Sequence, residues 1–161
     1  CPTIGEVFNE LTSTNFLRFL SELTGIDGLL SDPFFNGGGI HRTSNGGHLN
    51  IHSDYVFHGI TKWYRRINLL LYLTPNWQEE WGGNLELWDT DMSSKIKDVL
   101  PIQNRAVIFN TTTKSFHGHP HPLQCPNDIY RYSIALYYFT IEPPDDLTED
   151  ELHTSAQWKY I

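Results

Sequence analysis

The stretch RYSIALYYFT, residues 131–140, is the longest run in the chain with the character of a β-strand. Aromatic and apolar residues fill it, an Asn-Asp pair precedes it, and two consecutive prolines follow it. Alternate side chains of a strand share one face. Arg131, Ser133, Ala135 and Tyr137 are therefore expected to point the same way, toward the interior of a β-rich protein.

An inward arginine is costly in a β core unless its charge meets a carboxylate. The planar guanidinium of Arg131 suits a dicarboxylate ligand, because it can donate two parallel hydrogen bonds. The chain also contains 19 acidic residues, so a structural salt bridge is the alternative explanation.

Three further segments upstream also have the pattern of strands. They are INLLLYLT (67–74), WGGNLELW (81–88) and RAVIFN (105–110). Short strands separated by Gly, Pro and Asn turns indicate a β-sandwich or barrel. We expect strands from Ile40 to Ile141, with no internal repeat and no domain linker.

Helices are predicted before this region. Thr3 and Glu6 form a T-x-x-E capping box, and a second helix is expected from Thr14 to Leu23 with Gly25 as its stop. The proline-led acidic tail is predicted to be a surface strap with one helical turn after Asp146. The sequence thus indicates a single domain over residues 1–161, with helical support (1–34), a β core (35–142) and the strap (143–161).

Composition and charge narrow the class of partner. The net charge of −8 argues against a nucleic-acid partner, because binding a phosphate backbone needs a basic face. Lys62, Arg65 and Arg66 form the main local basic cluster, which we interpret as a solvated hairpin. No apolar run approaches the roughly 20 residues that span a bilayer, so no membrane partner is expected. Two cysteines, Cys1 and Cys125, form no disulfide framework, and a cytoplasmic location is the default expectation.

The segment HLNIHSDY, residues 48–55, carries a histidine and an aspartate two positions apart. On a strand, His52 and Asp54 would converge on one face. They would make two thirds of a facial 2-His-1-carboxylate metal site. The segment KSFHGHPHP offers a third ligand from His117, His119 or His121. An alternative of equal weight is that the H-x-D pair occurs by chance and that HGHPH is a polar loop that binds no metal.

The order of these motifs is more specific than any one of them. H-x-D is followed by Y-L-x-x-x-W with a double glycine and L-x-L, then by F-H-G and finally by R-x-S. From about Gly37 to Ile141 the chain resembles the Fe(II)- and 2-oxoglutarate-dependent dioxygenases, in particular their prolyl 4-hydroxylase-like branch. The resemblance implies a double-stranded β-helix, or jelly roll, with the N-terminal helices packed on its outside.

The resemblance also implies roles for individual residues. His52, Asp54 and His117 match the Fe(II) ligands and, with Arg131, the catalytic set. The residues that would contact 2-oxoglutarate are Arg131, Tyr72, Ser133, Leu70 and Leu85. His117 lies 14 residues before Arg131, whereas the family's usual interval between these two positions is about ten. An interval of ten would make His121 the third ligand. We prefer His117 and interpret 121–129 as a lengthened loop. His119 and His121 would lie in that loop and, with Trp63 and Tyr64, could contact the substrate.

By this resemblance the protein is an enzyme that couples oxidative decarboxylation of 2-oxoglutarate to hydroxylation of an unactivated C–H bond. Fe(II), 2-oxoglutarate and O2 are the implied cofactors, with ascorbate as an accessory reductant. The favoured substrate is a prolyl residue of a protein or peptide, and a free amino acid or small metabolite is the alternative. Two other hypotheses are a non-catalytic cupin-like binding module and a surface zinc or nickel site at HGHPH.

Overall fold

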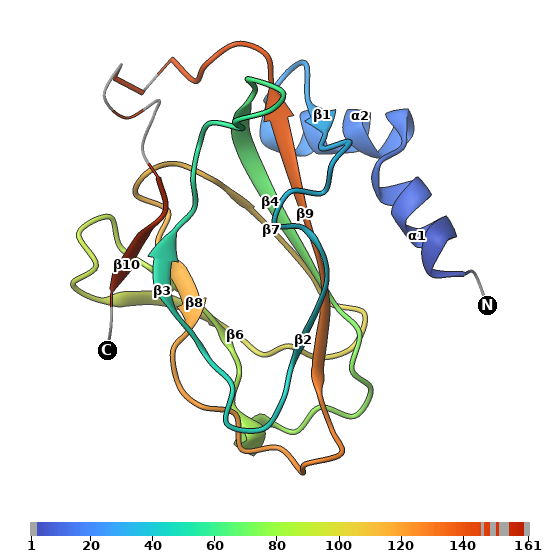
Figure 1. Ribbon diagram of the computed structural model, residues 1–161, viewed down its shortest axis with the longest axis vertical. Helices are drawn as coiled ribbons and strands as arrows, with labels where there is room; N and C mark the ends of the chain where they lie inside the picture. Colours follow the sequence, from blue (N-terminus) through green and yellow to red (C-terminus); the bar gives the residue numbers. More distant parts are fainter. Residues whose placement is uncertain (1–2, 146, 149–150, 152–154, 160–161) are drawn as a thin grey trace.

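The computed structural model describes residues 3–145, 147–148, 151 and 155–159, and within them the strands form two antiparallel sheets. One sheet has the order β1 (Leu30–Ser31), β9 (Arg131–Thr140), β4 (Tyr64–Tyr72) and β7 (Ala106–Asn110), and β2 (Gly39–Thr43) also pairs with β9. The other has the order β10 (Gln157–Lys159), β3 (Leu49–Ser53), β8 (His117–His119), β5 (Leu85–Trp88) and β6 (Lys95–Val99). The two sheets lie on opposite sides of the molecule's centre (Figure 1), as in the predicted jelly roll.

The four strands expected from sequence are present. β9 covers the whole of RYSIALYYFT, and β4, β5 and β7 lie in or overlap the segments INLLLYLT, WGGNLELW and RAVIFN. β4 and β9 pair along most of their length and form the centre of the first sheet. The register pairs Tyr72 with Ser133 and Leu70 with Ala135. Because directly paired residues share a face, these four side chains and Arg131 point toward the second sheet.

Two helices precede the sheets, as the capping signals predict. α1 (Ile4–Leu11) begins at the capping box of Thr3 and Glu6. α2 (Thr14–Thr24) begins at Ser13, whose side chain accepts a hydrogen bond from the Phe16 amide, and ends at Gly25. Gly25 has φ 72°, a left-handed conformation that favours glycine at a helix end.

The helices cover the outer face of the first sheet (Figure 1). Leu20 of α2 packs in one core with the residues of β4 and β9 that point away from the second sheet. These are Ile67, Leu69, Ile134, Leu136 and Tyr138. Tyr138 also donates a hydrogen bond from its hydroxyl to the Leu11 carbonyl, 2.9 Å away. The apolar core of the molecule therefore lies behind the first sheet, and the space between the sheets is free to carry polar groups. No described helix is long and apolar enough to cross a membrane.

A β-bulge in β4 decides which arginine enters the barrel. Asn68 pairs with Tyr137 and Ile67 with Tyr138, but the register then shifts, so that Arg65 pairs with Phe139. Strict alternation from Asn68 would turn Arg66 inward, whereas the extra residue turns Arg65 inward. Arg65 is 1% exposed. The interpretation of Arg65 as part of a solvated hairpin is therefore wrong.

The segment between β8 and β9 is irregular from residue 120 to residue 130, as expected for a lengthened loop. Leu123 and Cys125 of this loop are buried against Trp77. The loop is thus packed against the end of the barrel and brings the chain back to the start of β9. Asp146 lies outside the described residues, as do residues 149–150 and 152–154, so the helical turn that was expected after Asp146 is described only in part.

The packing of α2 on the first sheet predicts a contrast between two leucines of that helix. Leu20→Ala should lower the free energy of unfolding by about 2–5 kcal/mol, because it leaves a cavity in the core. Leu20 is 0% exposed and Leu23 is 57% exposed, so Leu23→Ala should change stability by less than about 0.5 kcal/mol. Chemical denaturation followed by circular dichroism measures both. Equal losses in the two variants would show that α2 does not pack as described.

Candidate metal centre and the barrel interior

Three side chains predicted to be metal ligands lie together between the sheets. His52 near the end of β3 pairs directly with His117, the first residue of β8, so that both imidazoles point to the same face. Asp54 follows β3 and shares this face with His52. The Asp54 carboxylate lies 3.7 Å from His52 Nε2 and 3.5 Å from His117 Nε2. One ligand atom from each residue lies within 4.8 Å of the others, and no other His, Cys, Asp or Glu in the described part of the chain forms such a group.

The two imidazoles are held in the orientation that metal binding requires. His52 Nδ1 lies 2.9 Å from the Asn50 carbonyl, and His117 Nδ1 lies 2.9 Å from the Ser115 carbonyl. A carbonyl can only accept, so each Nδ1 carries the proton and each Nε2 keeps its lone pair. Burial lowers the pKa of His117 to about 4, which keeps its imidazole neutral at neutral pH. Two neutral Nε2 atoms and a carboxylate are a donor set that fits a divalent metal.

Asp54 is kept ionised although it lies within the barrel. Burial raises its pKa, but Arg65, His117, a hydrogen bond from Asn68 and His52 together hold the pKa below its ordinary value. Asn68 Nδ2 donates to Asp54 Oδ2 over 2.6 Å, and Arg65 Nη1 lies 2.9 Å from the same oxygen. Both partners contact Oδ2, and Oδ1 is the oxygen that faces His52.

Aromatic rings hold the Arg65 guanidinium in place. Its central carbon lies 3.9 Å from the ring centre of Tyr55 and 3.8 Å from that of Tyr137. Tyr55 and Tyr137 are themselves fixed by hydrogen bonds from their hydroxyls to the carbonyls of Asn36 and Gly37. The Nε atom of Arg65 is buried and donates to no acceptor among the described residues. Sequence reasoning missed this group, because the bulge that turns Arg65 inward has no clear signature in the sequence.

Arg131 also points into the space between the sheets and is 6% exposed. Its Nε donates to the Gly83 carbonyl over 2.8 Å, and its Nη2 lies 3.5 Å from the Tyr72 hydroxyl. No ion pair between described residues involves Arg131. Burial lowers its pKa and Tyr72 raises it, while the guanidinium remains cationic at neutral pH. A buried positive charge is thus left with a phenol and a carbonyl as its partners within the described chain.

The second glycine of the WGGNLELW segment allows the chain to approach Arg131 closely. Gly83 has φ 73°, and a Cβ atom at this position would lie 2.5 Å from Leu123 Cδ2 and 3.1 Å from Arg131 Cδ. Any larger residue would displace either the loop or the arginine. The structure also shows where the other residues expected to contact 2-oxoglutarate lie. Ser133 on β9 pairs with Tyr72 on β4, and Leu70 points to the same face of the sheet as Tyr72. Leu85 is buried at the start of β5.

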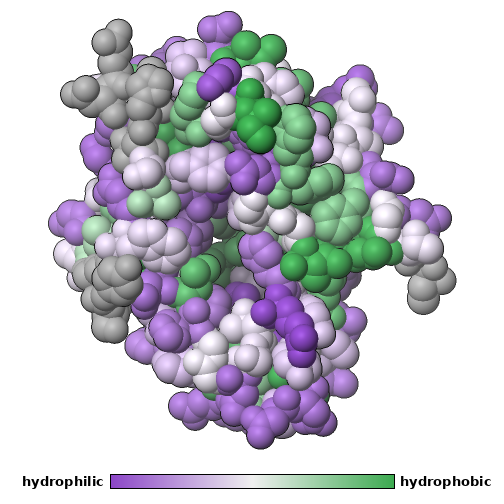
Figure 2. All heavy atoms as spheres, viewed as in Figure 1, coloured by the Kyte–Doolittle hydropathy of each residue, from purple (hydrophilic) through white to green (hydrophobic). Residues whose placement is uncertain are grey.

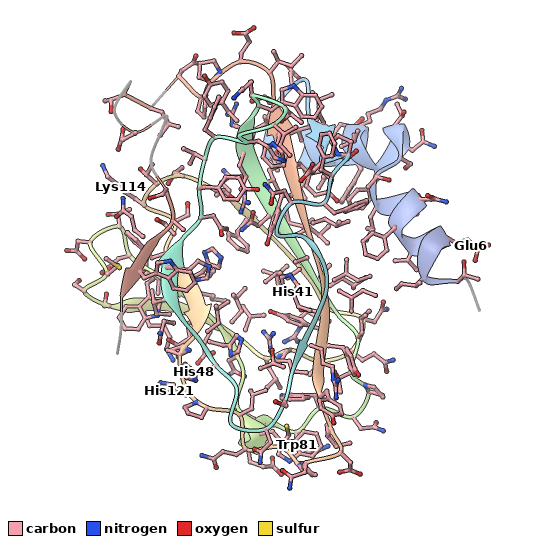
Figure 3. The ribbon with its side chains drawn as sticks, in the orientation of Figure 1. Glu6, His41, His48, Trp81, Lys114 and His121 are labelled. Carbon is pink, nitrogen blue, oxygen red and sulfur yellow. The ribbon has the colours of Figure 1, made fainter. Side chains whose placement is uncertain are left out.

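The remaining histidines of HGHPH lie apart from the metal group. His119 is the last residue of β8 and is buried, so its expected place in the loop is wrong. Burial is the main cause that lowers the pKa of His119 to about 3, and its Nδ1 has no hydrogen-bond partner among the described residues. His121 follows in the loop and is exposed, with Nε2 3.8 Å from Glu86. In Figure 3, His121 and His48 lie at one end of the second sheet, whereas Lys114 lies at the other.

Other predicted contacts are not brought to the metal group. Tyr64 precedes Arg65 on β4 and points to the opposite face, where its ring packs 5.4 Å from that of Phe57. Trp63 lies in the same hairpin and is half-buried. His41 contacts the Gly37 carbonyl, and His58 is fully buried beside Asp32.

In the view of Figure 2 the surface is hollowed near its centre, between the two sheets of Figure 1.

Comparison with known proteins gives one family. A sequence model described as the 2OG-Fe(II) oxygenase superfamily matches residues 38–139. Prolyl 3-hydroxylase OGFOD1 from Mus musculus is 40% identical over 79 residues, which are 47% of this chain and 14% of that protein. The chain thus spans a small part of the curated relative that it matches.

A solved structure gives the same fold. A prolyl 4-hydroxylase from Phytophthora capsici aligns with a TM-score of 0.57 at 23% identity, over 91% of this chain and 48% of that one. A prolyl hydroxylase from Trichoplax adhaerens, solved with a peptide fragment of the hypoxia inducible factor oxygen degradation domain, is 30% identical. It aligns with a TM-score of 0.39, over 47% of this chain and 31% of that one.

The bulge in β4 predicts losses of stability of different size for two adjacent arginines. Arg65→Met removes the cation beside Asp54 and should lower the free energy of unfolding of the metal-free protein by about 3 kcal/mol or more. Arg66→Met removes only a 3.3 Å hydrogen bond to Thr140, and should cost less than about 1 kcal/mol. Urea denaturation in the presence of a chelator measures both. A larger loss in the Arg66 variant would contradict the observed register.

Proposed function

The chain belongs to the 2OG-Fe(II) oxygenase superfamily, and we propose that it is a hydroxylase that acts on a prolyl residue of a protein or peptide. One observation carries the proposal. The family needs a metal and a dicarboxylate, and the space between the two sheets holds groups suited to both. His52, Asp54 and His117 form the candidate metal site. Arg131, which has no carboxylate partner among the described residues, is the candidate site for the dicarboxylate.

In this proposal His52 and His117 bind Fe(II) through Nε2, and Asp54 binds it through its carboxylate. The iron supplies the activation of O2 that the family uses to oxidise 2-oxoglutarate and hydroxylate the substrate. The chain's own contribution is to hold the ligands before the metal arrives. The Asn50 and Ser115 carbonyls fix the imidazole tautomers, and Arg65 with Asn68 fixes the carboxylate.

Arg131 would bind the carboxylate of 2-oxoglutarate that lies far from the metal. Its guanidinium is already oriented by the Gly83 carbonyl, and its Nη atoms face Tyr72. Tyr72 would donate its hydroxyl proton to the same carboxylate, because burial raises its pKa and keeps the phenol neutral. Ser133, paired with Tyr72, is a further donor on this face. A diacid would supply the counter-charge that Arg131 needs in a site with little water.

The assignment of a prolyl residue as the substrate rests on the comparison with known proteins and not on Arg65, because Arg65 is 1% exposed and its guanidinium lies between the rings of Tyr55 and Tyr137. The similarity to OGFOD1, whose name gives it as a prolyl 3-hydroxylase, favours the same substrate class.

The proposal is tested by succinate release. The metal-free protein is loaded with Fe(II) under argon and given 2-oxoglutarate, ascorbate and air with three substrate pools: proline-containing peptides, free amino acids and small metabolites. We expect succinate above background only with the peptides, together with a mass increase of one oxygen on a prolyl residue. Asp54→Ala should abolish both signals, because it removes one of the three ligands.

Succinate that rises only with free amino acids or metabolites would replace the peptide assignment. Absence of 2-oxoglutarate turnover and of metal binding would leave a non-catalytic binding module as the function.

Arg131→Ala tests the assignment of the 2-oxoglutarate site. The variant should bind Mn(II), a redox-stable substitute for Fe(II), as the unaltered protein does, because Arg131 is not a ligand. Its apparent KM for 2-oxoglutarate should rise by at least tenfold, since a charged hydrogen bond is lost. Arg42→Ala, an exposed arginine of β2 that stacks on Tyr130, serves as control. An unchanged 2-oxoglutarate saturation curve in the Arg131 variant would refute this role.

A further inference from the structure

Strand β10 lies beside the strand that carries two of the proposed ligands. It pairs antiparallel with β3, and the register sets Gln157 opposite Ser53 and Trp158 opposite His52 (Figure 1). Directly paired residues of antiparallel strands project to the same face. Trp158 therefore points to the side of the sheet on which His52 and His117 meet, whereas Gln157 points to the other side.

Trp158 stacks on the His52 imidazole. Their ring centres are 4.5 Å apart and their planes differ by 19°. The His117 ring lies 4.5 Å from the same imidazole at an interplanar angle of 46°. The Asn50 carbonyl, through Nδ1, and the stack with Trp158 both oppose rotation of the His52 ring about its Cβ–Cγ bond. A rotated ring would turn Nε2 away from Asp54.

The exposure of Trp158 indicates that core packing is not its main role. It is 46% exposed, although a tryptophan usually buries most of its surface. It belongs neither to the apolar core behind the first sheet nor to the cluster of Trp77, Leu123 and Cys125. Its defined contact is with a proposed metal ligand. An imidazole that binds a cation becomes more electron-poor, and an electron-rich indole face stabilises such a ring better than a neutral one.

We propose that Trp158 is a positioning residue for His52, so that strand β10 is part of the metal centre. The inference rests on the proposed function, because it takes His52 as a metal ligand. If the stack with Trp158 is stronger when His52 is bound to the metal, the stack raises the affinity of the site for the metal. Because such coupling is reciprocal, metal binding then stabilises the pairing of β10 with β3.

Metal affinity is the first test, and it needs no turnover. Isothermal titration with Mn(II) is carried out on the metal-free protein and on Trp158→Ala, Trp158→Phe and Gln157→Ala. Trp158→Ala should weaken Mn(II) binding about tenfold, as is typical when a residue that orients a ligand is lost. Trp158→Phe keeps a stacking ring and should recover most of the affinity. Gln157→Ala, on the same strand but on the opposite face, should bind as the unaltered protein does.

Tryptophan fluorescence is the second test, and it separates a positioning role from a purely structural one. Co(II) bound by His52 should quench the indole that stacks on that imidazole. The chain has five tryptophans, so the quenching of Trp158 is obtained by subtracting the quenching of Trp158→Phe from that of the unaltered protein. Co(II) should lower the emission of the unaltered protein, and more than half of this loss should disappear in Trp158→Phe. This readout does not depend on whether the alanine variant folds.

The outcomes are distinguishable. No Mn(II) binding by the unaltered protein would overturn the proposed function itself. Normal Mn(II) binding in which Trp158→Ala matches Gln157→Ala would overturn the role of Trp158 and leave the proposed function standing. Co(II) quenching that is the same in the unaltered protein and in Trp158→Phe would also overturn that role, because the stacked indole would then not sense the metal.

Discussion

The organisation of the barrel follows from the electrostatics of two buried arginines. A guanidinium is stable in an apolar interior only if other groups compensate its charge. Arg65 has the carboxylate of Asp54 and the faces of two tyrosines. Arg131 has the Gly83 carbonyl and the Tyr72 phenol, and no described acidic side chain pairs with it. The described chain thus completes the charge pair of Arg65 by itself and leaves Arg131 without a carboxylate partner.

Strand β4 connects the two halves of this arrangement. Its inward residues are Arg65 and Asn68, which hold Asp54, and Tyr72, which contacts Arg131. One strand therefore orients both a proposed metal ligand and the proposed dicarboxylate site. The helices on the far side of β4 supply the apolar packing that keeps the strand in place. This separation of the apolar core from the polar interior allows charged groups to be placed between the sheets without weakening the core.

Much of this organisation can be predicted from sequence, because the signals are local. The capping box at Thr3, the stop at Gly25 and the alternation in residues 131–140 each depend on neighbouring residues and each identified the element that is present. The convergence of His52 and Asp54 is local as well. The sequence does not predict which residues of neighbouring strands pair with one another. Arg65 faces inward because of a register shift between β4 and β9, and Trp158 reaches His52 because a three-residue strand pairs with one that lies about 100 positions earlier.

The case of His119 shows why strand ends are harder to predict than strand centres. The sequence predicts that His119 belongs to the lengthened loop of residues 121–129, but His119 is the last residue of β8, which ends before Pro120. His119 therefore shares a face with His117 and is buried, while His121, beyond the proline, is exposed. Because a proline has no amide hydrogen to donate, Pro120 is where the sheet can end. The loop between β8 and β9 accounts for most of the 14-residue interval between His117 and Arg131, and both side chains are buried. Spacing along the chain is thus a weaker guide to the third ligand than its position in a strand.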